Sequence, residues 1–64
     1  MKKHEEYVVR DSRGDYEKRA GNSLEAIQTM RTLCRATPKA DRVFCYVVRP
    51  SGHLQELLSM AGER

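Results

Sequence analysis

The most informative stretch of the 64-residue sequence for predicting the fold is Val43-Phe44-Cys45-Tyr46-Val47-Val48. Its six consecutive apolar or aromatic side chains, three of them valines, are typical of a strand that is covered on both faces. Successive side chains of a strand point to opposite faces, so Phe44, Tyr46 and Val48 share one face. Helices can cover the other face. We expect the face of Phe44 and Tyr46 to need a further element, a second copy or a partner.

The segment before this strand predicts a β-hairpin and a helix. Residues 6–11 alternate as a first strand does, with Tyr7 and Val9 on one face, and residues 16–20 form a weaker and more polar return strand. Gly14 lies between them, where a glycine can adopt the positive φ that a tight turn requires. The polar return strand is expected at a sheet edge, since charged side chains deter unwanted strand pairing.

A helix is predicted from residue 23 to about residue 37. Asn22 or Ser23 can cap its start, and with Asn22 as the cap the Glu25 carboxylate can reach back to the cap amide. Pro38 ends it, because the residue before a proline disfavours helical geometry. Apolar side chains recur at spacings of three and four along one stripe: Ala26, Ile27, Met30, Leu33 and Cys34.

The segment after Pro50 has two interpretations. Its apolar residues follow the i, i+3, i+4, i+7 spacing of an amphipathic helix: Leu54, Leu57, Leu58 and Ala61. This spacing favours a second helix that ends near Gly62, and we take it as the prediction. A fourth strand over residues 53–60 is the alternative, because a turn containing Gly52 can also open a hairpin.

The predicted order β-β-α-β-α gives one small two-layer α+β domain over residues 1–64, with residues 1–5 expected to be flexible. A right-handed crossover makes the third strand antiparallel to the first. The result is a three-stranded, mainly antiparallel sheet in the order 2-1-3, with the helices on one face. The apolar third strand then lies at an edge. We therefore expect a homodimer, formed through the third strands or through the open sheet faces.

Composition limits the classes of function. Twelve basic and nine acidic side chains give a net charge of +3, which is too mild to indicate nucleic-acid binding by itself. No apolar stretch approaches the roughly 18 residues of a membrane span, and residues 1–6 lack the apolar segment of a signal peptide. We expect a soluble, cytoplasmic protein that has no membrane partner.

The residues that could carry chemistry give little support for an enzyme. His4 and His53 lie outside any recognisable catalytic motif, so no catalytic residue is predicted. Neither Cys34 nor Cys45 has a second metal ligand two to four residues away, the spacing that structural zinc sites use. We predict buried thiols, no metal site and no cofactor.

A non-enzymatic interaction protein, an adaptor or inhibitor that presents a surface to a larger protein partner, is therefore the leading prediction. Aromatic and arginine side chains dominate binding hot spots. The predicted partner-binding residues are Arg31, Arg35, Arg42, Phe44 and Tyr46.

A small nucleic-acid-binding regulator is the alternative. Arg31 and Arg35 are four residues apart and share one helix face, and cations that converge in this way can bind phosphates. The nucleic-acid residues of this alternative are Arg31, Arg35, Lys39 and Arg42.

The hairpin, the capped helix that begins Ser23-Leu24-Glu25-Ala26-Ile27 and the strand after it resemble small accessory proteins of bacteria and their phages. The resemblance covers about half of the chain and implies no catalytic residue.

Overall fold

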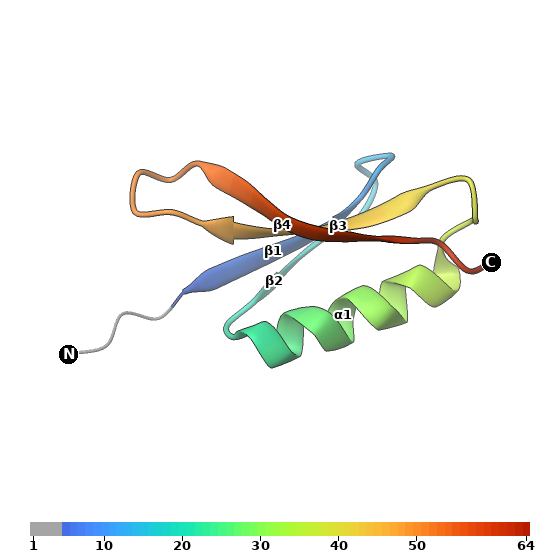
Figure 1. The fold of residues 1–64 in the computed structure, drawn as a ribbon, viewed down its shortest axis with the longest axis horizontal. Helices are drawn as coiled ribbons and strands as arrows, with labels where there is room; N and C mark the ends of the chain where they lie inside the picture. Colours follow the sequence, from blue (N-terminus) through green and yellow to red (C-terminus); the bar gives the residue numbers. More distant parts are fainter. Residues whose placement is uncertain (1–4) are drawn as a thin grey trace.

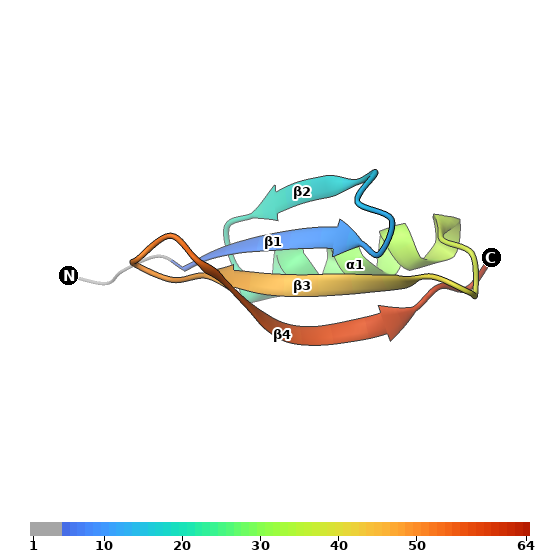
Figure 2. The same cartoon turned by 90° about the horizontal axis from the view of Figure 1, so that it is seen from above.

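One α-helix lies across one face of a four-stranded antiparallel sheet in the computed structural model, which describes residues 5–64 (Figure 1). Of the predicted flexible start, residues 1–5, all but Glu5 lie outside the described residues. The elements are β1 (Glu6–Asp11), β2 (Glu17–Ala20), α1 (Ser23–Ala36), β3 (Arg42–Val48) and β4 (Leu54–Ala61). The sheet order is β2-β1-β3-β4, which Figure 2 shows from the side opposite α1.

The hairpin between β1 and β2 is built around Asp11, whose side chain is buried. Gly14 has a φ of 77°, as predicted for the turn, and its N–H donates to the Asp11 carbonyl oxygen at 3.1 Å. The Asp11 carboxylate accepts hydrogen bonds from the N–H groups of Asp15 (3.0 Å) and Tyr16 (3.4 Å). The guanidinium of Arg13 lies 3.4 Å from the same carboxylate. These contacts give the buried Asp11 carboxylate its hydrogen-bond partners and hold the turn between β1 and β2 in place.

The helix begins and ends close to where the sequence predicts. Asn22 is the N-cap, and its side-chain oxygen accepts from the Glu25 N–H at 2.8 Å. The Glu25 carboxylate reaches one residue further back than expected and accepts from the Gly21 N–H at 3.0 Å. Thr37 leaves the helix with φ −103° and ψ 132°, directly before Pro38. The local signals therefore set both ends of α1.

The core lies between α1 and the sheet. As predicted, the odd-numbered residues of β3 face the helix and the even-numbered ones face away, which the buried and half-buried alternation along this strand confirms. Tyr7 and Leu33 pack at the margin of the core. The buried cluster consists of Val9, Ala20, Ala26, Met30, Cys34, Val43 and Cys45.

The segment after Pro50 is a strand, so the predicted second helix is wrong and the alternative is right. The order is β-β-α-β-β, and β4 pairs with β3 from Arg42 opposite Ala61 to Val48 opposite Leu54. The β3–β4 register shifts between Cys45, which faces Leu58, and Tyr46, which faces Glu56. This irregularity leaves Leu57 as an extra residue, the arrangement of a β-bulge.

The fourth strand also corrects the expected position of β3. The predicted order 2-1-3 is right for the first three strands, but β3 is a central strand because β4 pairs along its other edge. Two copies therefore cannot pair through the edges of their third strands, because those backbone groups already bond to β1 and β4. The free edges of the described sheet are β2 and β4.

Residues 62–64 continue from β4 and close the C-terminal end of α1. Their backbone hydrogen bonds join them to residues 34–41: Gly62 N–H to Asp41 O (2.9 Å), Glu63 N–H to Cys34 O (2.9 Å), Arg64 N–H to Thr37 O (2.9 Å) and Lys39 N–H to Arg64 O (3.0 Å). The last carbonyl groups of a helix have no partner within the helix. This segment supplies a partner to the Thr37 carbonyl and a second donor to the Cys34 carbonyl, which also accepts from the Thr37 N–H at 3.2 Å.

Both thiols are buried, as predicted, both are free, and their ionisation gives a test of the core. Burial raises the pKa of Cys34 and of Cys45, because the thiolate form loses hydration. Because the folded-state pKa is above the unfolded value, this contribution to stability is complete below the ordinary thiol pKa of about 8.5 and is lost as pH rises toward the folded-state pKa.

We expect urea unfolding curves to show a fall in stability above about pH 8.5 that is smaller in the double variant Cys34→Ala/Cys45→Ala. Comparing the two proteins at each pH removes the contribution of tyrosines and lysines. An identical alkaline loss in both proteins would contradict the prediction.

Candidate functional site

The face of the sheet opposite α1, which is turned toward the viewer in Figure 2, is called the open face. It carries two of the aromatic residues that the sequence singles out, Phe44 and Tyr46. Strand register fixes its membership, because directly paired residues share a face. From β2 to β4 the open face contains Glu17, Arg19, Glu6, Val8, Arg10, Arg42, Phe44, Tyr46, Val48, Leu54, Glu56, Ser59 and Ala61.

Two aromatic rings form the centre of the open face. The ring centroids of Phe44 and Tyr46 are 6.3 Å apart, and the ring planes are tilted by 33°. The Arg10 guanidinium lies 5.6 Å from the Tyr46 centroid, within cation–π distance. Val8, directly opposite Tyr46 on β1, is only 2% exposed. The open face therefore packs a small apolar patch of its own while Phe44 and Tyr46 stay half-buried.

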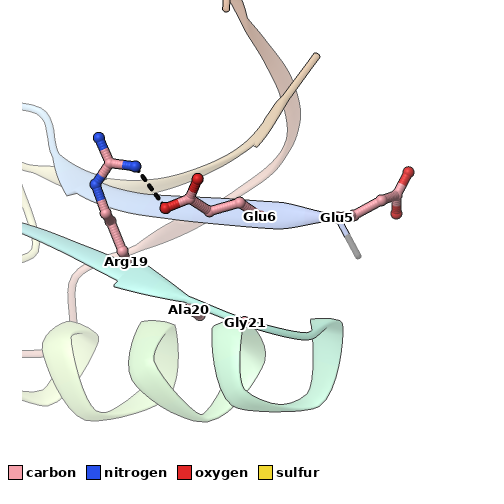
Figure 3. A pocket seen from close by; sticks show the side chains of 5 residues that line it. All are labelled: Glu5, Glu6, Arg19, Ala20 and Gly21. Carbon is pink, nitrogen blue, oxygen red and sulfur yellow. Dashed lines mark hydrogen bonds and ion pairs between the residues drawn. The ribbon is translucent and has the colours of Figure 1, made fainter. Parts of the chain in front are cut away.

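Ion pairs neutralise most of the charge on the open face. The Arg10 guanidinium lies 3.1 Å from the Glu17 carboxylate, and Arg19 pairs with Glu6 across β1 and β2 (Figure 3). Arg42 instead donates to the Ser59 hydroxyl on β4, at 2.9 Å from Nη2. The open face holds three arginines and three glutamates. It therefore presents aromatic surface without an excess of either charge.

The five predicted partner-binding residues do not form one surface. Arg42, Phe44 and Tyr46 lie on the open face, whereas Arg31 and Arg35 are exposed on α1, beneath the sheet in Figure 1. Exposed helix residues point away from the sheet that the helix covers, so the two groups are directed to opposite sides of the molecule.

The predicted nucleic-acid residues divide in the same way. Arg31, Arg35 and Lys39 are exposed on α1 and on the loop that follows it. Arg42 is part of the open face and bonds to Ser59. The C-terminal end of α1 and the loop after it therefore carry three of the four cations predicted for this site.

Sequence reasoning missed the role of Arg10. Its position suggests only a hairpin cation among carboxylates, but β1 pairs with β3 in a register that places Arg10 opposite Phe44 and beside Tyr46. The alternation of β1 contained part of the signal, because it puts Val8 and Arg10 on one face. The register between strands distant in sequence decided the rest.

The other surface features suggest no chemistry. One shallow hollow, lined by Glu5, Glu6, Arg19, Ala20 and Gly21, lies beside the Arg19–Glu6 ion pair (Figure 3). Within residues 5–64, no three side chains of the metal-binding types converge. The His4 that sequence reasoning considered lies outside this range. No helix in the described part of the chain has the length and apolar character that crossing a membrane requires.

The fold defines a small α+β domain in which one helix covers one face of an antiparallel sheet over the described residues. Comparison with protein families, with curated proteins and with solved structures finds no match.

Proposed function

We propose that the chain is a non-enzymatic interaction module that binds a larger protein through its open face, with Phe44 and Tyr46 at the centre of the contact. The observation that supports this most is the pair of half-buried rings on a central strand, with Arg10 stacked on one of them. Aromatic and arginine side chains that are surrounded by other contacts are typical of binding hot spots.

The charge balance of the open face favours a protein over a nucleic acid. Phosphate binding needs cations that are free to replace counterions, and each neutralised phosphate steepens the salt dependence. On this face Arg10 and Arg19 already contact Glu17 and Glu6. A partner that places aliphatic or aromatic side chains against Phe44 and Tyr46 would match the surface better than a phosphate backbone would.

Loss of the two rings should abolish most of the binding. We expect the double variant Phe44→Ala/Tyr46→Ala to bind its protein partner on the order of 1000-fold more weakly, since each of the two hot-spot truncations costs about 2 kcal/mol or more. Immobilised wild-type protein and variant would be used to capture partners from cells of the native host. Calorimetry on the recovered partner then gives both affinities.

The double variant Arg31→Ala/Arg35→Ala is the matched control, because it truncates two exposed side chains on the other side of the molecule. It should retain the partner at wild-type affinity, and raising the salt concentration should change the binding little. Circular dichroism checks that both double variants are folded. Capture that depends on the two arginines and not on the two rings would contradict the proposal.

One observation supports the alternative, nucleic-acid binding by the helix end. Among residues 5–64, Arg31, Arg35 and Lys39 have no carboxylate within ion-pair distance, so their charge is available to a phosphate. This function requires an affinity for a fluorescent oligonucleotide that falls steeply with salt and is lost in Arg31→Glu/Arg35→Glu. An affinity that this variant leaves unchanged would exclude the helix end as the binding site.

A further inference from the structure

We propose that two copies of the chain pair antiparallel through their β4 edges, about a two-fold axis between Leu57 and Leu58, so that the two sheets become continuous. Such a contact is isologous, because each copy contributes the same strand. It is independent of partner binding through the open face, and it would place two open faces side by side.

The two free edges of the described sheet differ in how they deter pairing. The β2 edge has four residues, three of which are exposed and charged: Glu17, Lys18 and Arg19. Short strands and charged side chains are the usual protection of a sheet edge. The β4 edge has eight residues and one charged side chain, Glu56. It therefore lacks the protection that β2 has.

Two of the four exposed large apolar residues in the described part of the chain lie on β4. Leu57 is 47% exposed and Leu58 is 37% exposed, although both lie in a strand of the sheet. Leu58 is on the helix side because it pairs with the buried Cys45. Ile27 of α1 is also 41% exposed. The fourth, Leu24, is also on α1 and is 66% exposed. A second copy of β4 would cover Leu57 and Leu58.

The bulge in β4 selects the register of this pairing. In a two-fold pair that uses all of β4, residue 54 lies opposite residue 61 of the other copy. Residues 54 and 61 would be on opposite faces of a regular strand, because their separation is odd. In this strand both are on the open face, since Leu54 pairs with Val48 and Ala61 with Arg42. The extra residue, Leu57, shifts the alternation between the two halves of β4. Residues 54, 55 and 56 of one copy therefore lie opposite residues 61, 60 and 59 of the other copy, which are on the same face.

The same register brings complementary charges together. Glu56 lies opposite Ser59 of the other copy, and directly opposed residues have Cβ atoms about 5 Å apart. Within each copy the Arg42 guanidinium bonds to the Ser59 hydroxyl at 2.9 Å. Within residues 5–64, neither Arg42 nor Glu56 has an ion-pair partner. The pairing would supply each with one, twice per dimer.

These features point to a second copy as the occupant. A bulged edge is a poor match for a regular strand, because the alternation of side chains fails on one side of the bulge. In the two-fold pair, the second copy of β4 carries the same bulge beside the axis. The alternation of its side chains therefore shifts at the same place as in the first copy. Self-pairing therefore satisfies the geometry that would reject most other strands.

Sedimentation equilibrium of the wild-type chain, from about 10 µM to about 1 mM, tests the pairing. We expect a mass that rises toward twice 7.4 kDa. Leu57→Lys places like charges at the axis and should weaken dimerisation more than about tenfold. Thr32→Lys is the matched control, because it adds the same charge beside β2 and should leave dimerisation unchanged.

A charge exchange tests the register itself. Arg42→Glu and Glu56→Arg should each weaken the dimer, and the double variant should restore it toward the wild-type dissociation constant. Within one copy Arg42 pairs with Ala61 and Glu56 pairs with Tyr46, so the two residues are not opposite each other and the rescue reports contact between copies. A wild-type monomer at about 1 mM would overturn the proposal. So would a dimer that Leu57→Lys leaves intact, or a double variant without rescue.

Discussion

Gly62→Ala should destabilise the protein by about 2–4 kcal/mol, although it adds only one methyl group. The new Cβ would overlap the backbone carbonyl oxygens of Pro38 and Thr37. Backbone atoms cannot rotate away as a side chain does, so residues 62–64 would have to leave their position. Their four backbone hydrogen bonds to residues 34–41 would then be lost, each with a net worth of about 1 kcal/mol.

Removal of residues 63–64, which leaves residue 62 in place, separates this mechanism from a general effect of a mutation near the core. If alanine acts by detaching this segment, the removal should cost most of what Gly62→Ala costs, because three of the four backbone hydrogen bonds belong to residues 63–64, and the same removal from the alanine variant should cost little more. Glu63→Ala is the control, since Glu63 contributes through its backbone N–H, and its side chain is exposed. Urea unfolding of the wild type, Gly62→Ala, the two shortened chains and Glu63→Ala gives the free energies. Additive losses would contradict the mechanism.

The elements that short-range signals determine could be predicted from the sequence. The limits of β1 are those predicted, and the Asn22 cap and Pro38 set the ends of α1. The alternation of β3 identified correctly which side chains face the helix. Each of these depends on residues within one or two turns of the chain, so no distant contact had to be known.

The secondary structure of β4 could not be predicted because its leucines have the spacing of a helix although the segment is a strand. A regular strand would separate its apolar residues by two. In β4 Leu54 lies on the open face and Leu58 on the helix side, with Leu57 as the extra residue between them, so the leucines that have the spacing of a helix do not share one face of the strand. Pairing with β3 decides the structure here, and periodicity alone did not distinguish the two states.

The candidate site could be predicted in its aromatic part and not in its arginines. Phe44 and Tyr46 follow from strand alternation alone. Arg31 and Arg35 were combined with them because arginines are common in interfaces, although a two-layer fold directs the outer side of its helix away from the open face. Arg10 belongs to the site through the β1–β3 register, which is a tertiary property. Residue type was therefore a weaker guide than the face on which each residue lies.

Met30→Ala is the other substitution for which we expect a large effect. Met30 is 0% exposed and is the largest of the fully buried side chains in the described residues. It lies in the core cluster with Val9, Val43 and Cys45, where the helix meets the sheet. Truncating a buried methionine to alanine costs about 2–5 kcal/mol, from lost burial and from the cavity that remains.

Domains of this length have a total stability of about 3–10 kcal/mol by the usual per-residue range, so Met30→Ala should leave a partly unfolded population at 37 °C. Met30→Leu keeps most of the volume and should cost less than about 1.5 kcal/mol, while Gln28→Ala, on the exposed side of α1, should stay within about 0.5 kcal/mol. Thermal and urea unfolding of the three variants would test this order. Equal losses for Met30→Ala and Gln28→Ala would mean that α1 does not bury its apolar stripe against the sheet, and the faces assigned to β3 would lose their basis.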